Sequence, residues 1–151
     1  MKTKFYEYTQ NNSGGSFTED EKLCHRVFIE DKNIDDANTK AENIGIYFNG
    51  LEDGLDCECC GDRWCQPNEI KFPYTYGTFD LCEAKDKAKQ YNLEYKKTVF
   101  RFLGKGKPNP NEYDLIFNNV ESYAKYLANE FGFGGIDARI YYLKGEVIDI
   151  K

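Results

Sequence analysis

Residues 23–45, LCHRVFIEDKNIDDANTKAENIG, place an expected strand immediately before an expected helix. Residues 23–30 alternate between two faces and are rich in the β-branched and aromatic side chains that favour strands. One face of that strand would carry Leu23, His25, Val27 and Ile29. In residues 34–44 the apolar side chains recur at helical spacing, at Ile34, Ala37, Ala41 and Ile44. A helix that directly follows a strand predicts a helix packed across a sheet.

The remaining periodic segments predict more strands than helices. Further strands are expected at residues 4–9, 45–50, 93–104 and 113–117, and a terminal hairpin at residues 138–143 and 146–150. Further helices are expected at residues 80–91 and 119–131. We therefore predict an α+β fold, a single domain over residues 1–151, in which a mostly antiparallel sheet carries two to three packed helices and a cysteine-rich loop.

The composition is that of an ordered chain without membrane segments. Aromatic residues make up 16% of the 151 positions, which argues against disorder although the mean hydropathy is -0.73. No apolar run approaches the length of a transmembrane helix, and the N-terminus lacks the apolar core of a secretory signal. We therefore expect a protein of the cytoplasm, whose six cysteines are free thiols or metal ligands rather than disulfides.

The charge is unevenly distributed along the chain. Residues 1–84 contain 8 Lys and Arg against 17 Asp and Glu, whereas residues 85–107 contain 8 against 2. The net charge of the whole chain is -6. A mostly acidic protein with one basic segment is not typical of general nucleic-acid binding, but its acidic part can complement a basic protein surface.

Residues 56–65, DCECCGDRWC, hold the most distinctive pattern in the chain and are called the cysteine loop below. Cys57, Cys60 and the following glycine form a CxxCG knuckle of the kind that wraps one side of a zinc ion. The predicted metal ligands are Cys57, Cys60, Cys65 and Cys24, with His25 and Cys82 as other sources of the second pair. The alternatives are a tight loop of reduced thiols anchored by Trp64, and redox chemistry, which the acidic neighbours disfavour.

Motifs of the common enzyme classes are missing from the sequence. There is no phosphate-binding glycine loop, no GxSxG and no HExxH. Cys24 and His25 adjoin on an expected strand, where neighbouring side chains point to opposite faces and do not form a catalytic pair. We therefore predict a protein without catalytic residues.

Basic and aromatic residues are interleaved in residues 85–107. This pattern can hold phosphates and stack bases, so it is a candidate surface for RNA or for a protein partner. The alternative is a solvated helix face followed by a strand with its aromatic residues inward. The candidate residues are Lys85, Lys89, Tyr95, Lys96, Lys97, Arg101, Lys105 and Lys107.

Three sequence motifs of the chain resemble those of a known protein family. QNNSGGSF (10–17), CHRVFIE (24–30) and DCECCGDRW (56–64) are similar to those of a family of small bacteriophage proteins, over about residues 3–76. The resemblance implies no catalytic activity and transfers no functional residue beyond the motifs. Small acidic phage proteins of this kind often counter host defence by occupying the basic nucleic-acid channel of a nuclease.

The expected function is therefore that of a phage-encoded, non-enzymatic inhibitor of a bacterial defence complex, similar to an anti-CRISPR protein. It would bind a nucleic-acid-binding effector of the host or its guide-RNA channel, since carboxylates complement Lys and Arg. Two other functions stay open. One is a sponge that sequesters a nucleotide signal, and the other is a zinc-stabilised nucleic-acid-binding module that uses the cysteine loop and residues 85–107.

Overall fold

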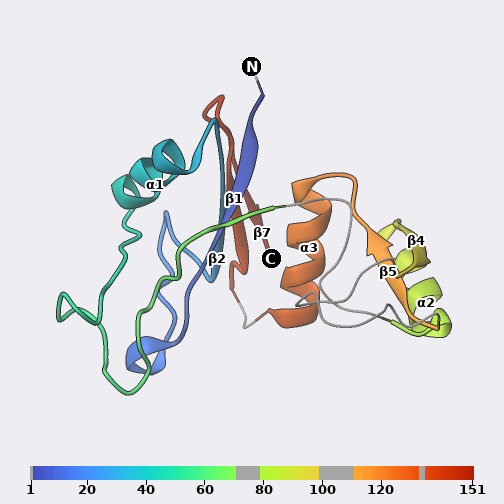
Figure 1. Cartoon of the computed structure of the whole chain (residues 1–151), viewed down its shortest axis with the longest axis horizontal. Coiled ribbons are helices and arrows are strands. Elements are labelled where there is room, and N and C mark those ends of the chain that lie inside the picture. Colours follow the sequence, from blue (N-terminus) through green and yellow to red (C-terminus); the bar gives the residue numbers. More distant parts are fainter. Residues whose placement is uncertain (1, 71–78, 99–110, 133–134) are drawn as a thin grey trace. The chain divides into compact units, whose positions relative to one another are not determined.

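The computed structural model describes residues 2–70, 79–98, 111–132 and 135–151. Within these ranges it holds the helices α1 (Ile34–Asn43), α2 (Leu81–Tyr91) and α3 (Val120–Phe131), and short strands that mostly pair antiparallel (Figure 1). The predicted α+β class is therefore confirmed. None of the helices described is long and apolar enough to cross a membrane.

The chain forms two compact units. The first unit comprises residues 1–70 and 127–151, and the second unit comprises residues 71–126. The boundary falls within α3, whose first residues belong to the second unit and whose last residues belong to the first. The expectation of a single domain over residues 1–151 stays a prediction.

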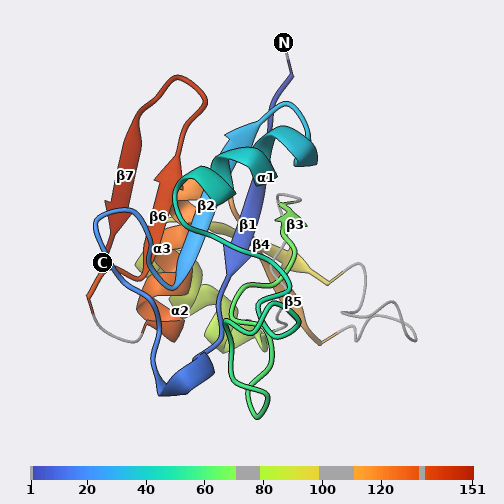
Figure 2. The same cartoon turned by 90° about the vertical axis from the view of Figure 1, so that its left-hand side faces the viewer.

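A five-stranded sheet organises the first unit (Figure 2). Its strands lie in the order β3 (Asn68–Glu69), β1 (Lys4–Thr9), β2 (Arg26–Asp31), β6 (Ala138–Tyr141) and β7 (Val147–Ile150). β2 and β6 run parallel, while the other neighbouring strands run antiparallel. The sheet therefore joins the two ends of the sequence, and β6 and β7 form the predicted terminal hairpin.

Helix α1 packs on one face of this sheet. Val27 and Ile29 of β2 point to that face, and both are fully buried. They meet Ala37 and Ala41 of α1, which are also fully buried. Because alanine side chains are short, the helix can lie close to the strands. The predicted helix at residues 34–44 is confirmed as Ile34–Asn43. Of its predicted apolar face, Ala37 and Ala41 are buried and Ile44 is half-buried, but Ile34 is 43% exposed because it lies at the first turn.

Local chemistry sets both ends of α1. The Asn33 side-chain oxygen accepts a hydrogen bond from the Asp36 N–H at 2.8 Å, which satisfies one of the amides at the helix start. At the other end, the Ile46 N–H donates to the Ala41 carbonyl at 2.9 Å. Gly45 adopts φ +109° between them, a conformation that favours glycine.

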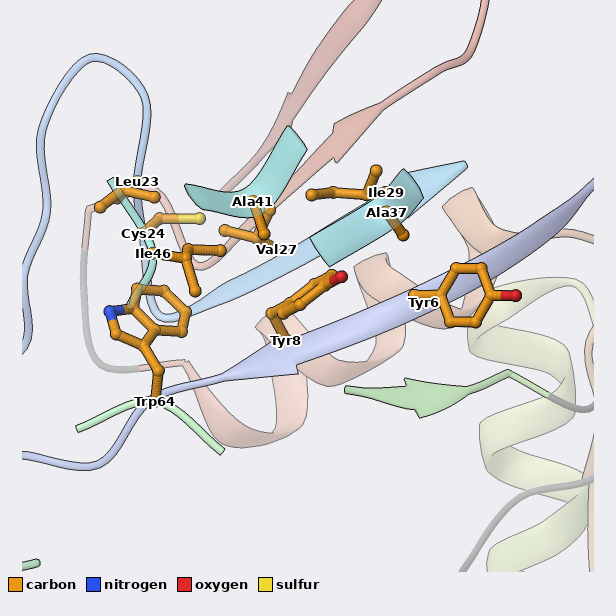
Figure 3. Close-up of a cluster of buried hydrophobic side chains, with 10 residues drawn as sticks. All are labelled: Tyr6, Tyr8, Leu23, Cys24, Val27, Ile29, Ala37, Ala41, Ile46 and Trp64. Carbon is orange, nitrogen blue, oxygen red and sulfur yellow. The ribbon is translucent and has the colours of Figure 1, made fainter. Parts of the chain in front are cut away.

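The core between α1 and the sheet is closed by aromatic side chains (Figure 3). Tyr8 is fully buried, and its hydroxyl donates to the Asn38 side-chain oxygen at 2.8 Å. Trp64 is 2% exposed and lies at the end of the core beside Ile46. The buried cluster consists of Tyr6, Tyr8, Leu23, Cys24, Val27, Ile29, Ala37, Ala41, Ile46 and Trp64.

A buried arginine ties the segment before β2 to the terminal hairpin. Arg139 of β6 is 2% exposed, and its guanidinium donates to the Asp149 carboxylate of β7 at 2.5 Å. The same guanidinium donates to the Asp20 carbonyl at 3.1 Å. The Tyr141 hydroxyl donates to the Lys22 carbonyl at 2.5 Å. These bonds hold residues 20–22 beside the hairpin.

Two expected strands differ from the structure. β2 begins at Arg26 rather than at residue 23, because Leu23 and Cys24 both turn into the core instead of alternating between faces. Residues 45–50 form no strand, because Gly45 and Asn49 both take positive φ and interrupt extended backbone. Ile46 is buried from an irregular segment instead.

The second unit pairs β4 (Glu94–Lys97) with β5 (Tyr113–Ile116) in an antiparallel ladder. Helix α2 begins at its cap Asp80, whose carboxylate accepts from the Glu83 N–H at 2.9 Å. An edge-to-face aromatic pair, Tyr91 against Tyr126, joins α2 to the middle of α3 within this unit. The expected loop at residues 104–112 and the end of the expected strand at 93–104 lie largely outside the described residues.

Replacing Ile29 by alanine should destabilise the first unit strongly. Ile29 is fully buried under α1, so Ile29→Ala removes buried apolar surface and leaves a cavity. We expect a loss of about 2–5 kcal/mol in the free energy of unfolding, measured by urea denaturation. Ile34→Ala is the matched control, because Ile34 is 43% exposed and its truncation should cost less than about 0.5 kcal/mol. Equal losses in the two variants would contradict this account of the core.

Candidate metal centre in the cysteine loop

Three cysteine sulfurs gather in the cysteine loop. The sulfurs of Cys57, Cys59 and Cys60 all lie within 4.8 Å of one another. Cys59 and Cys60 are exposed, their sulfurs are 3.5 Å apart, and Cys57 is half-buried. The structure thus brings together the predicted ligands Cys57 and Cys60 and adds Cys59, which the CxxC spacing had passed over.

Cys57 and Cys59 are joined in a disulfide. The expectation that the thiols are all reduced is therefore not met for this pair. The loop turns so tightly that their Cα atoms are 5.4 Å apart, which is within the range that a disulfide spans. Cys60 keeps a free thiol beside them.

The backbone of the loop forms the turn expected of a knuckle. The N–H groups of Cys60 and Gly61 both donate to the Cys57 carbonyl, at 3.2 and 2.9 Å. Gly61 has φ +79°, a conformation that a side chain would strain. This turn folds the three sulfurs toward one another and depends on backbone bonds.

Asn11 of the first motif holds the cysteine loop from outside. Its side-chain amide donates to the carbonyl of Cys60 at 3.3 Å and, in a shorter bond, to the carbonyl of Asp62. Its side-chain oxygen accepts from the Ser13 N–H at 2.8 Å. The Ser13 hydroxyl oxygen in turn accepts from the Cys57 N–H at 3.0 Å. Asn11 and Ser13 therefore hold both ends of the CxxC turn.

Arg63 provides a second set of bonds to the first motif. Its guanidinium donates to the Gln10 side-chain oxygen at 3.3 Å, to the Ser16 carbonyl at 2.6 Å and to the Ser13 carbonyl. Gln10 is buried and donates onward to the Cys24 carbonyl at 2.7 Å. The three motifs at residues 10–17, 24–30 and 56–64 are thus connected in space by hydrogen bonds.

Asp56 fastens the start of the cysteine loop. Its carboxylate accepts from the Tyr47 hydroxyl at 2.7 Å and from the Arg63 N–H at 2.9 Å. Burial of the phenol, followed by its bond to Asp56, raises the pKa of Tyr47. A Cβ atom on Gly50 would lie 1.9 Å from a carboxylate oxygen of Asp56, so only glycine fits there.

The other predicted ligands lie elsewhere. Cys24 is fully buried, its thiol donates to the Arg26 carbonyl at 3.0 Å, and burial raises its pKa to about 12. Such a thiol does not readily become a thiolate ligand. Cys65 is exposed but is not part of the cluster, because its backbone pairs with Thr9, the last residue of β1. The structure therefore brings neither Cys24 nor Cys65 to the three sulfurs.

The remaining alternative ligands are also separate from the cluster. His25 packs edge-on against Phe17 with ring centroids 4.3 Å apart, and burial lowers its pKa to about 4. Its imidazole is therefore neutral at physiological pH. Cys82 is an exposed residue of α2 in the second unit.

The chemistry of the cluster fits a thiophilic metal ion. Zn–S bonds of about 2.3 Å at tetrahedral angles place sulfurs roughly 3.8 Å apart, close to the 3.5 Å between Cys59 and Cys60. In the part of the chain that the structure describes, this is the group of cysteine, histidine and carboxylate side chains found close enough to share an ion. The cluster can bind a metal once Cys57 and Cys59 are reduced.

Among the described residues of the basic segment, those of β4 are divided between two faces. Tyr95 and Lys97 alternate with Lys96 along β4, so Lys96 points to the opposite face. Tyr95 is 37% exposed and packs edge-on against Tyr113. Lys85 and Lys89 are exposed on α2. Arg101, Lys105 and Lys107 lie outside the described residues.

A shallow acidic hollow lies at the end of α1 in the first unit. Its volume is about 590 Å³, and its lining holds three acidic residues, Asp20, Glu21 and Glu42, against one lysine, Lys22. Hydrogen bonds from the backbone N–H groups of Leu23 and Lys22 lower the pKa of Asp20. The hollow therefore carries negative charge at neutral pH.

The chain belongs to the family described as Domain of unknown function (DUF7296), whose profile matches residues 3–111. The matched range includes all three motifs, the cysteine loop and the whole basic segment at residues 85–107. No curated protein and no solved structure matches the chain.

Replacing Asn11 by aspartate should release the cysteine loop. The Asn11 amide faces two carbonyl oxygens, and Asn11→Asp would put a carboxylate oxygen in its place. We expect a loss of about 1–3 kcal/mol in the free energy of unfolding and faster alkylation of Cys60 by iodoacetamide. Asn12→Asp is the control, since Asn12 is exposed and its side chain makes no capping bond. If both variants behave like the wild type, Asn11 does not hold the loop.

Proposed function

We propose that this protein is a phage-encoded, non-enzymatic inhibitor of a bacterial defence complex, similar to an anti-CRISPR protein. It acts in the host cytoplasm by binding a nuclease, or the guide-RNA channel of one, through the acidic surface of its first unit. The observation that carries the proposal is the imbalance of exposed charge in residues 2–70.

The exposed charges of residues 2–70 are mostly negative. The exposed basic residues are Lys2, Lys4, Lys22 and Lys32. The exposed acidic residues are Glu19, Asp20, Glu21, Asp35, Asp36, Glu42, Glu52, Asp53, Glu58, Asp62 and Glu69. A surface with this excess of carboxylates is attracted to a channel lined by Lys and Arg and repelled by free nucleic acid.

The carboxylates fall mainly on three segments, residues 19–21, α1 and the stretch from residue 52 to residue 62. The first of these and the end of α1 meet at the acidic hollow. Few exposed cations neutralise this charge: Lys22 is the one lysine that lines the hollow, and Lys4 already pairs with Glu69 at 3.2 Å. Long basic side chains of a partner can enter such a hollow, where the carbonyl end of α1 adds to the attraction.

We also propose that the cysteine loop, when reduced, holds a zinc ion. Zinc favours thiolate ligands in a tetrahedral arrangement, and a knuckle-type turn is its common host. Its role would be to stiffen the loop, which carries Glu58 and Asp62 and follows Asp53, so that these carboxylates keep fixed positions for a partner. The preorganisation of an interface lowers the entropy lost on binding.

The two other functions have weaker support. The acidic hollow would repel the phosphates of a nucleotide signal, which disfavours a nucleotide sponge. A zinc-stabilised nucleic-acid-binding module would need the basic segment as one surface, and Lys96 lies on the opposite face of β4 from Tyr95 and Lys97. We therefore favour binding to a protein.

Reversing charge at the acidic hollow should weaken the complex with the target. Glu21→Lys with Glu42→Lys places two cations against a basic partner, and we expect the dissociation constant to rise about tenfold or more. The target would first be named by mass spectrometry of tagged pull-downs from host lysate. Binding to the purified RNA-guided nuclease would then be measured at low and high salt, together with its cleavage activity.

The control reverses charge in the second unit. Lys85→Glu with Lys89→Glu should leave binding and inhibition unchanged, because these residues lie on α2 outside the acidic surface. If the control loses binding while the hollow variant keeps it, the basic segment is the interface. Failure of the wild-type protein to bind or inhibit any host nuclease would remove the proposal.

A further inference from the structure

We propose that the cysteine loop is an open three-thiolate zinc site that alternates with the Cys57–Cys59 disulfide. Reduced protein holds zinc through Cys57, Cys59 and Cys60, and oxidised protein releases it. This inference rests on the proposed zinc ion, and it adds a ligand set, an open coordination position and a redox control to that proposal.

The ligand set is incomplete within the cluster. Three sulfurs lie within 4.8 Å of one another, and no fourth cysteine, histidine or carboxylate of the described ranges joins them. Closed structural zinc sites have four protein ligands, whereas sites with three keep a position for water or another ligand. Cys59 and Cys60 are exposed, so solvent or an external thiol can reach that position.

The disulfide and the metal exclude each other. In the disulfide the sulfurs of Cys57 and Cys59 carry no negative charge, and only Cys60 remains as a thiolate ligand. A single thiolate holds zinc weakly, since affinity comes from several charged donors in one geometry. Formation of this disulfide therefore removes two of the three ligands in one reaction.

The exchange needs an external disulfide as oxidant, and oxidised glutathione is the one used below. The Cys59 thiolate attacks one glutathione sulfur, the glutathione S–S bond breaks, and the first glutathione leaves as a thiolate. The Cys57 thiolate then attacks the Cys59 sulfur, which closes the protein disulfide and releases the second glutathione. Two electrons pass from the protein to the oxidant, zinc leaves as Zn²⁺, and excess reduced glutathione reverses the reaction.

The surrounding structure permits both states because it does not use the sulfurs. The loop is held by the Asn11 amide on the Cys60 carbonyl and by the Ser13 oxygen on the Cys57 N–H. The turn itself is held by backbone bonds to the Cys57 carbonyl. The sulfurs can therefore change partners while the backbone of the loop keeps its position.

The test uses the full chain, reduced and stripped of metal. Zinc is titrated against a chromophoric chelator, and we expect one zinc per chain. Oxidised glutathione is then added, and we expect zinc to pass to the chelator as the Cys57–Cys59 disulfide appears in peptide mass spectra. Excess reduced glutathione should restore binding. Circular dichroism before and after each step reports whether the fold is kept.

Three variants separate the ligands. Cys60→Ser and Cys59→Ser should each weaken zinc binding at least tenfold, because each removes one of three thiolates. Cys60→Ser should still form the Cys57–Cys59 disulfide, whereas Cys59→Ser cannot form it. Cys65→Ser is the matched control, because Cys65 is exposed in the same loop but outside the cluster, and it should keep both. Loss of zinc from Cys65→Ser equal to that from Cys60→Ser would overturn the open ligand set.

The two levels of the proposal fail in different ways. If the reduced wild-type protein binds no zinc, the proposal of a zinc site is wrong, and so is the proposed redox switch. If zinc binds but stays bound when oxidised glutathione is in excess, the proposal of a zinc site is supported and the proposed redox switch is overturned. Release of zinc with a disulfide that involves Cys65 would also overturn it.

Discussion

The first unit depends on the backbone pairing of residues 9–11 with residues 63–65. Gln10 and Trp64 form an antiparallel bridge, the Asn11 N–H donates to the Arg63 carbonyl at 2.8 Å, and the Cys65 N–H donates to the Thr9 carbonyl at 3.2 Å. This short ladder extends β1 past its last residue. It brings Trp64 into the core and places the cysteine loop beside the first motif.

The two sides of this ladder have different roles, one in the core and one at the cysteine loop. On the inner side, the Trp64 ring fills the end of the core and is 2% exposed. On the outer side, the side chains of Asn11 and Arg63 bond the backbone of the cysteine loop and of the first motif. The loop can thus expose its sulfurs and carboxylates while its backbone is anchored to a packed sheet. A site on a fixed scaffold suits binding, because little order has to be gained when a partner arrives.

The sequence predicts well those features that local periodicity determines. The helix at residues 34–44, with Ala37 and Ala41 inward, could be read from apolar spacing. The terminal hairpin could be read from two apolar runs around Gly145, which takes φ +99°. The parallel pairing of β2 with β6 could not, because it joins distant segments and leaves no local pattern. The strand predicted at residues 45–50 is wrong, because GIYFNG has the composition of a strand whereas Asn49 takes positive φ.

The candidate site was partly predictable for the same reason. The CxxCG spacing indicated Cys57 and Cys60, and the turn with Gly61 at positive φ places their sulfurs in one cluster. Cys59 was missed because the ligands of a knuckle are three residues apart, and Cys59 lies between them. The tight turn that brings its sulfur to the other two is seen only in the folded structure. Cys24 was proposed from its residue type, but the core buries its thiol. The hydrogen bonds by which Asn11 holds the cysteine loop could not be predicted, because they form only when the first motif and the loop come together in the fold.

Native-state amide hydrogen exchange tests most directly whether this ladder anchors the cysteine loop. The amide protons of Asn11 and Cys65 should exchange only with the opening of the core, as slowly as that of Ile29 in β2. The amide of Glu58, in the exposed part of the loop, should exchange much faster. If Asn11 and Cys65 exchange as fast as Glu58 while Ile29 stays protected, the ladder is not part of the folded core and the account of the site is wrong.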